Sequence, residues 1–328
     1  MNRNLRTLSG IAAVVLLSAA TAATAQFIAQ RGDKPSRSKL SLHLLGGNYT
    51  AGAKLVVAER PRLLKIFDLG ADMRVAMKDF KGRNPNGVLV LRLWTPVRYP
   101  ATDNPESSAE RYWIDWIWPR LTAISASERK LIDYVEGPNE GDNTPTWGSD
   151  DEVRWFARFW VRLATLMKAN GIRPCVGSVP VGNPGSFETR WPLFMPALQA
   201  AQNAKGAWSY HAYTLEYSTN VGVENWYSLR YRQLVAQIRP LNPGLSTLPL
   251  ILSEGGVDQS GNGATSGWQA RGTANQYKQW LSWFDTEIRK DSYVIGVTLF
   301  QSGDANLWPS FDTEPINPWL ADYIRQNR

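Results

Sequence analysis

The sequence predicts an α/β protein that folds as a single (β/α)8 barrel, or TIM barrel, on three observations. Eight apolar runs rich in β-branched residues recur along the chain, and most are followed by a segment with helical spacing. Several runs are almost continuously apolar, which is typical of parallel strands that are buried on both faces. About 300 residues remain once a short N-terminal leader is set aside, which suits one large α/β domain.

The predicted strands are short apolar runs at regular intervals: 40–45, 63–69, 88–94, 130–135, 174–178, 207–213, 248–253 and 294–301. The clearest helix begins at Asp151, after a cap at Ser149 or Asp150, and ends before Gly171. The other predicted helices lie between or after the strands: 51–59, which is short, 71–80, 109–124, 190–204, 225–238, 273–289 and 318–325. A doubly wound open sheet is the competing topology, but no glycine-rich phosphate motif follows any strand.

The N-terminal 25 residues have the layout of a secretory signal peptide. Arg3 and Arg6 precede an apolar segment at 11–17, and Ala23-Thr24-Ala25 forms an A-x-A cleavage site. The apolar segment is short for a bilayer span, so we expect cleavage after Ala25, a secreted or periplasmic protein and no stable membrane insertion. Residues 26–39 are polar and basic and are predicted to be a flexible lead-in, and residues 40–328 the barrel.

Composition excludes several classes of protein. The formal charge is +7, or +5 without the two leader arginines, and it is spread along the chain, so no nucleic-acid partner is predicted. Cys175 is the only cysteine, which rules out an intrachain disulfide, and two histidines are too few for the usual zinc site. No G-x-S-x-G nucleophile motif occurs. We therefore expect no metal and no cofactor, and a monomer.

Functional side chains of a (β/α)8 barrel lie at the C-terminal ends of its strands. The fourth predicted strand is followed by Glu136-Gly137-Pro138-Asn139-Glu140, the sixth ends near His211 and Tyr213, the seventh is followed by Glu254, and the eighth ends at Gln301. Carboxylates after strands four and seven would face each other across the barrel mouth. Glycosidic bond cleavage needs one carboxyl to protonate the leaving oxygen and a second to attack the sugar or activate water.

Asn139-Glu140, His211-x-Tyr213 and Glu254 together resemble the motifs of a large clan of retaining glycoside hydrolases with (β/α)8 barrels, clan A-like. The resemblance implies that Glu140 is the acid/base and Glu254, 114 residues later, the nucleophile. It also implies that Asn139 contacts the sugar 2-hydroxyl, and that His211 and Tyr213 line the sugar subsite and orient the nucleophile. The expected function is an exported glycosidase that cleaves a β-linked polysaccharide or oligosaccharide internally, with retention.

The sequence departs from the clan pattern at two places. Many members carry an arginine at the end of strand two that binds the nucleophile; here Lys65 lies within that strand and Arg92 on strand three, and either could supply the charge. Glu136 is a rival acid, although we expect it lower in the barrel wall, paired with Lys65 or Arg92. The tryptophan that often ends strand eight is absent, since Trp308 comes seven residues after Gln301.

The chain contains fifteen tryptophans. Trp94, Trp147, Trp268 and Trp308 fall on loops at the predicted mouth, where they could stack on sugar rings or pack against the protein. The helical tryptophans are predicted to be core, and His43 to be structural.

Two alternatives remain open at this point. A non-catalytic carbohydrate-binding barrel would share the fold and the aromatic residues. A polysaccharide lyase would use His211 or Tyr213 as its base. The positive net charge leaves open whether the glycan is acidic. The sugar and its linkage are not predicted.

Overall fold

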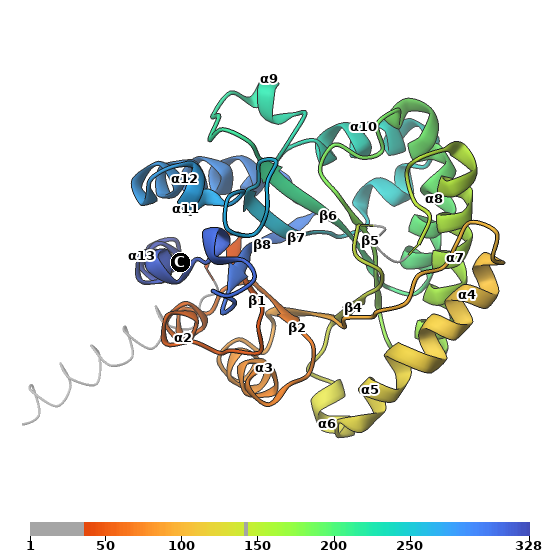
Figure 1. Cartoon of the computed structure of the whole chain (residues 1–328), viewed down its shortest axis with the longest axis horizontal. Coiled ribbons are helices and arrows are strands. Elements are labelled where there is room, and N and C mark those ends of the chain that lie inside the picture. Colours follow the sequence, from red (N-terminus) through yellow and green to blue (C-terminus); the bar gives the residue numbers. More distant parts are fainter. Residues whose placement is uncertain (1–35, 141–143) are drawn as a thin grey trace, which may run out of the picture.

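The computed structural model describes residues 36–140 and 144–328, and in these residues eight parallel strands close into a barrel in chain order (Figure 1). This confirms the (β/α)8 barrel and excludes the open sheet. The strands are β1 Leu40–Leu44, β2 Leu63–Phe67, β3 Val88–Arg92, β4 Tyr134–Glu136, β5 Pro174–Val179, β6 Ala207–Thr214, β7 Leu250–Val257 and β8 Val294–Ser302.

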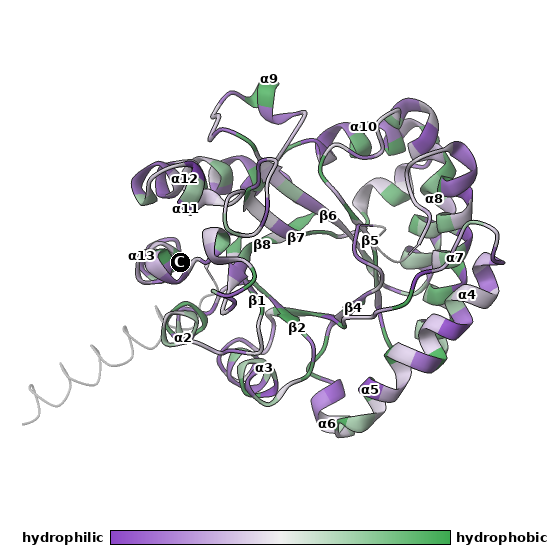
Figure 2. Cartoon of the chain, viewed as in Figure 1, coloured by the Kyte–Doolittle hydropathy of each residue, from purple (hydrophilic) through white to green (hydrophobic). Residues whose placement is uncertain are grey.

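Helices surround the barrel, and hydrophobic and hydrophilic residues alternate along them as amphipathic helices require (Figure 2). They are α2 Ala51–Ala58, α3 Ala71–Arg83, α4 Pro105–Arg111, α5 Trp118–Ala123, α6 Ala126–Arg129, α7 Asp150–Ala169, α8 Phe187–Asn203, α9 Val221–Glu224, α10 Tyr231–Leu241, α11 Trp268–Arg271, α12 Ala274–Arg289 and α13 Asn317–Gln326. No helix of the described residues has the length and apolar character that a bilayer span needs.

Most predicted elements are confirmed within a few residues, and three need correction. Strand β4 begins at Tyr134 rather than at residue 130, because a capping box of Ser125 and Glu128 starts the short helix α6 just before it. The predicted helix 109–124 is split by a π-helical segment, Tyr112–Ile117. The predicted helix 225–238 begins only at Tyr231, where α10 starts, and a turn separates α10 from the short helix α9.

Helix α7 shows how the sequence covers the barrel wall. Ser149 caps its start by accepting a hydrogen bond from the amide of Glu152, and its apolar face is buried. Gly137, just after β4, lies so close to this helix that a Cβ there would come within 2.6 Å of the Trp160 ring. Trp160, Trp191 and Trp280 are fully buried, as expected of helical tryptophans. Trp116, Trp118 and Trp283 are only partly buried.

The predicted signal peptide and its cleavage site lie outside the described residues, as does most of the predicted lead-in. Its last four residues, 36–39, are held against the barrel. The Ser36 hydroxyl donates to the carbonyl of Ile324 at 2.7 Å, and the Lys39 amide donates to Asp285 Oδ1 at 2.6 Å. Residues 36–39 thus contact α12 and α13, through the Ser36 hydroxyl and the Lys39 backbone amide.

Candidate active site

A cleft of about 880 Å³ opens at the C-terminal ends of the strands. A smaller recess of about 320 Å³ adjoins it and shares Arg92, Trp94 and Asn139 with it. Among the described residues, six ionisable side chains other than tyrosine line the main cleft: Asp68, Arg92, Glu140, Glu254, Asp258 and Asp304. The loop after β4 and strand β7 itself thus bring both predicted catalytic carboxylates to one cavity.

Glu254 is aimed into the cleft by an irregularity in β7. Along the β6–β7 ladder Leu252 pairs with Tyr210, and Glu254 pairs with the very next residue, His211, so Ser253 is an extra residue. Such a bulge re-aims the side chains that follow it. Because of this bulge, Glu254 faces the barrel axis although only 5% of the residue is exposed.

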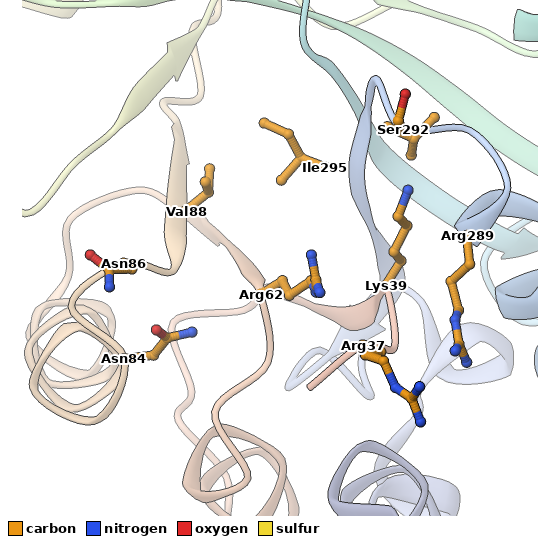
Figure 3. Close-up of a pocket in the computed structure, with 10 residues that line it drawn as sticks. Arg37, Lys39, Arg62, Asn84, Asn86, Val88, Arg289, Ser292 and Ile295 are labelled. Atoms are coloured by element: carbon orange, nitrogen blue, oxygen red, sulfur yellow. The ribbon is translucent and has the colours of Figure 1, made fainter. Parts of the chain in front are cut away.

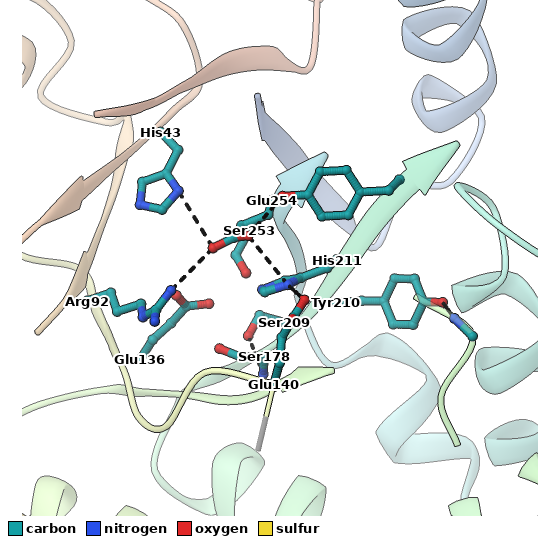
Figure 4. A network of polar contacts seen from close by, with 12 residues as sticks. His43, Arg92, Glu136, Glu140, Ser178, Ser209, Tyr210, His211, Ser253 and Glu254 are labelled. Carbon is teal, nitrogen blue, oxygen red and sulfur yellow. Dashed lines mark hydrogen bonds and ion pairs between the residues drawn. The ribbon is translucent and has the colours of Figure 1, made fainter. Parts of the chain in front are cut away.

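Positive charge and one hydroxyl surround the Glu254 carboxylate (Figure 4). Lys65 Nζ lies 3.2 Å and Arg92 Nη1 3.4 Å from its Oε1, and the Tyr213 hydroxyl donates to its Oε2 at 2.9 Å. Burial alone would raise the pKa of Glu254, but the charges of His211, Lys65 and Arg92 outweigh it and hold this pKa well below its usual value. Glu254 is therefore ionised at neutral pH.

Glu140 is placed by a bulge in the neighbouring strand. The β5–β6 register shifts between Val176 and Val179, where Gly177 and Ser178 have φ values of 117° and 46°. The carbonyl of Ser178 accepts a hydrogen bond from the Glu140 amide at 3.2 Å. Glu140 itself has φ 44°, a left-handed conformation that is uncommon for a residue with a Cβ and is often found at functional sites.

His211 links the two carboxylates. Its Nδ1 lies 2.5 Å from Glu140 Oε1 and 3.6 Å from Glu254 Oε2. The Glu140 side chain is 34% exposed, whereas His211 is fully buried. Burial would lower the pKa of His211, but the charges of Glu254 and Glu140 outweigh burial and raise it. His211 thus holds Glu140 in place beside Glu254.

Glu140, His211 and Glu254 also form the set of side chains that could hold a metal ion, with one ligand atom of each within 4.8 Å of the others. Two features of the described site oppose a metal. Lys65 and Arg92 already lie on one oxygen of Glu254. The raised pKa of His211 favours its protonated form, which cannot ligate.

Glu136 lies deeper in the barrel wall, as expected. It is fully buried, and one of its oxygens lies 2.8 Å from Lys65 Nζ. Burial acts to raise the pKa of Glu136, but the Lys65 charge opposes it, and the net shift is downward. Lys65 therefore links Glu136 to Glu254, and Glu136 is not among the residues that line the cleft.

The predicted tryptophan platforms divide into two pairs. Trp94 and Trp308 line the cleft and are 52% and 37% exposed. Trp147 is 5% exposed, with its ring centroid 5.1 Å from that of Phe194. Trp268 is 3% exposed and stacks on Tyr277 at 5.0 Å. The prediction that Trp147 and Trp268 face a ligand is wrong, because the loop that carries Trp147 and the short helix α11 that begins at Trp268 both pack onto aromatic side chains of the helix layer.

Asn139 lines the cleft beside Glu140, but Gln301 does not reach it. Gln301 is fully buried, and its side chain accepts from the Asp304 amide and donates to the Asp304 carbonyl, both at 2.8 Å. Its Nε2 also lies 3.2 Å from the carbonyl of Trp308. Gln301 therefore shapes the β8 loop that carries Trp308, and the expectation of direct sugar contact is wrong in this structure.

Sequence reasoning missed two residues close to the carboxylates. His43 on β1 was expected to be structural, but its Nδ1 lies 3.7 Å from Glu254 Oε1, and burial lowers its pKa well below the usual value. Asp258 lines the cleft just after β7. Its place four residues after Glu254, at the same strand end, was the signal that could have identified it.

Asp258 provides a test of the charge in the cleft. Burial, followed by the charges of Glu140 and Glu254, raises the pKa of Asp258 to about 6. The pKa of Asp258 is thus higher in the folded than in the unfolded protein, so folding favours the neutral carboxyl. The contribution of Asp258 to the free energy of unfolding is present below its unfolded-state pKa and is lost as pH rises through about 6. Asp258→Asn is therefore expected to raise the unfolding temperature relative to wild type at pH 8 but not below pH 4. The exposed control Asp115→Asn should show no such pH-dependent difference, and an equal shift at both pH values would contradict the charge assignment.

No protein-family profile and no curated protein matches the sequence. Among solved structures, the chain is similar to a GH128 (subgroup II) endo-β-1,3-glucanase from Pseudomonas viridiflava, with 13% identity, 88% of this chain and 98% of that one covered, and a TM-score of 0.48. It is similar to a β-mannanase from Streptomyces thermolilacinus, with 12% identity, 84% and 81% coverage and a TM-score of 0.48. It is also similar to an endo-1,4-β-D-mannanase from Thermotoga petrophila RKU-1, with 10% identity, 88% and 99% coverage and a TM-score of 0.45. All three of these proteins are named as glycoside hydrolases.

Proposed function

We propose that this protein is a retaining glycosidase that cleaves a polysaccharide or oligosaccharide. One observation carries the proposal. Glu140, which follows β4, and Glu254, which lies on β7, line the same cleft, and an oxygen of Glu140 is within 4.8 Å of an oxygen of Glu254. Retaining glycosidases need two carboxyl groups about 5–5.5 Å apart, whereas inverting enzymes leave room for water at about 6.5–9.5 Å.

The surroundings of the two carboxylates support different roles. Glu254 is buried, ionised and hydrogen-bonded by Tyr213, as a nucleophile must be. Glu140 is more exposed and lies beside Asn139 at the cleft surface, where a glycosidic oxygen could reach it. We assign Glu254 as nucleophile and Glu140 as acid/base, with Lys65 and Arg92 both holding the charge of Glu254.

The reaction then has two steps. Glu140 donates its proton to the glycosidic oxygen as Glu254 attacks the anomeric carbon, which forms a glycosyl ester and releases the leaving sugar. Glu140, now a carboxylate, takes a proton from water as the water oxygen attacks the same carbon and Glu254 departs. Two inversions give net retention.

The charge of the cleft favours a neutral glycan over an acidic one. Asp68, Asp258 and Asp304 line the cleft in addition to the two catalytic carboxylates. Arg92, the one cation among the described residues that line it, already contacts Glu254. Like charges would repel a uronate near the reacting centre. The adjoining recess lengthens the cleft, which suits internal cleavage of a β-linked chain.

The test is to incubate the protein with a panel of neutral and uronate-containing polysaccharides and to measure new reducing ends. We expect reducing ends from at least one neutral β-glycan, with the first-formed product in the β-configuration by NMR. An inverted product would refute the retaining mechanism. Binding without any reducing ends would indicate a non-catalytic carbohydrate-binding barrel, and unsaturated products from a uronate polymer would indicate a lyase.

Trp94 and Trp308 are expected to stack on sugar rings, because both present exposed indole faces to the cleft. Replacing either by Ala should weaken oligosaccharide binding about 2- to 10-fold, the effect of losing an aromatic contact of about 0.5–1.5 kcal/mol. Isothermal titration calorimetry on an inactive variant measures this. Trp226→Ala is the matched control, since Trp226 is 54% exposed but does not line the cleft. Equal loss in the control would contradict the stacking role.

A further inference from the structure

A second cavity lies at the opposite end of the barrel from the candidate active site (Figure 3). Its volume is about 670 Å³, and it is lined where strands begin rather than where they end. Lys39 and Arg62 immediately precede β1 and β2, and Val88 and Val294 begin β3 and β8. The cavity is therefore separate from the cleft that holds Glu140 and Glu254.

The lining of this cavity is strongly cationic. It contains Arg37, Lys39, Arg62 and Arg289, and no acidic side chain lies among the described residues that line it. The four cations come from three segments that are distant in sequence. A recess lined by charges of one sign focuses the electric field and concentrates ions of the opposite sign.

Lys39 shows that this positive charge is only partly compensated. The residue is 7% exposed, and its Nζ donates to the carbonyls of Ile288 at 2.9 Å and Asp291 at 2.7 Å, which leaves a third N–H. Burial, with the charges of Arg62 and Arg289 adding to it, lowers the pKa of Lys39 to about 8, against the opposing charges of Asp291 and Asp285. An anion in the cavity would stabilise the ammonium form.

The nearby carboxylates have partners of their own. Asp291 accepts hydrogen bonds from the Tyr231 hydroxyl at 2.6 Å and from Arg232 at 2.8 Å. Asp285 accepts from the Lys39 amide and from the Tyr323 hydroxyl, and lies 3.7 Å from Arg289. Asp285 is thus shared among several donors and cannot neutralise four cations.

The arginines and amides offer donors that suit an oxyanion. Arg62 donates through Nε to the carbonyl of Ser36 at 2.5 Å, which anchors the side chain and leaves the outer guanidinium nitrogens for a ligand. Arg37 is exposed at the rim, and the amides of Asn84 and Asn86 lie on the other side (Figure 3). Planar guanidinium groups bind carboxylate, sulfate and phosphate through paired hydrogen bonds.

We propose that this cavity binds a saccharide unit that carries a sulfate, phosphate or carboxylate group. Its volume falls in the range of small-molecule sites, about 300–1,000 Å³, and exceeds what a bare ion fills. Val88, Val294 and Ile295 supply an apolar surface for the carbon skeleton, and the cations hold the charged group. Because the site faces away from the catalytic cleft, it anchors the protein to an anionic glycan and takes no part in bond cleavage.

Calorimetry at low and high salt tests the proposal with four probes: inorganic phosphate, inorganic sulfate, a sulfated oligosaccharide and its unsulfated counterpart. The pocket variant is Arg37→Gln/Arg62→Gln. The matched control is Arg154→Gln/Arg158→Gln, which removes the same charge from two exposed residues of α7. We expect the sulfated oligosaccharide to bind wild type and control alike, to bind the pocket variant at least about tenfold more weakly, and to lose affinity in high salt, where charge interactions are screened.

Several results would overturn the proposal. Equal weakening in both double variants would show that net charge, not this cavity, is responsible. If phosphate or sulfate binds but the sulfated oligosaccharide does not, the cavity is not a saccharide site. If the unsulfated oligosaccharide binds as well as the sulfated one, the cavity does not require an anionic group. Arg37→Gln alone guards against misfolding, because that side chain is exposed and Arg62 still anchors Ser36. Hydrolysis at the cleft should be unchanged in the pocket variant, and the binding test stands even if the cleft proves inactive.

Discussion

Replacing Glu254 by Gln is expected to lower kcat by on the order of 10⁴-fold or more while oligosaccharide binding persists. The amide keeps the size of the side chain and can still accept from Tyr213, but it cannot attack the anomeric carbon. It also removes the charge that Lys65 and Arg92 surround at 3.2 and 3.4 Å. Reducing-end assays measure the loss of turnover, and calorimetry with an oligosaccharide measures the binding that remains.

The control for this prediction is Glu216→Gln, which removes an exposed carboxyl from the loop after β6 and should leave turnover unchanged. A fluorosugar with an activated leaving group should label wild type at Glu254, and peptide mass spectrometry locates the adduct. Normal hydrolysis by Glu254→Gln, or labelling of another residue, would show that the assigned nucleophile is wrong.

Replacing Glu140 by Gln is expected to reduce kcat about 10²- to 10⁴-fold on a natural glycan, the range for loss of a general acid–base group. The loss should be much smaller at the first step with an aryl glycoside whose leaving group needs no proton. Added azide should then restore turnover and give a glycosyl azide of retained configuration, since azide can attack the ester without a general base.

The pH profile tests the charge state of Glu254. Because the pKa of Glu254 is held well below its usual value, Glu254 stays ionised through neutral pH. Lowering the pH slightly below neutral should therefore cost no activity through protonation of the nucleophile. A fall of kcat/KM on the acidic side near neutral pH that persists in Asp258→Asn would contradict this charge state.

Much of the fold was predictable from local pattern. A parallel strand buried on both faces must be almost continuously apolar, and this pattern allowed runs such as Leu63–Phe67 and Leu250–Val257 to be predicted as strands. The order of these runs then placed Glu140 and Glu254 at the mouths of β4 and β7, since all eight strands of such a barrel point the same way. Glu136 was expected to pair with Lys65 or Arg92, and in the structure it pairs with Lys65.

The failures occurred where a side chain's direction depends on neighbours distant in sequence. Trp147 and Trp268 were predicted to lie on loops at the mouth of the barrel, yet both are buried, because they pack against aromatic side chains of α8 and α12. Nothing near Gln301 in the sequence shows that it turns back to its own loop. Lys65 and Arg92 were alternatives by sequence, but in the closed barrel both reach the same oxygen of Glu254.

The amino-acid sequence therefore determined the barrel, the strand order and the two carboxylates, because apolar periodicity and strand direction are local properties that repeat eight times. Only the tertiary structure decided how those carboxylates meet. The bulges at Gly177-Ser178 and at Ser253 aim them, and His211, Lys65 and Arg92 on three other strands supply the charges around Glu254. The cationic cavity at the other end of the barrel likewise exists only because closure brings Arg37, Arg62 and Arg289 together.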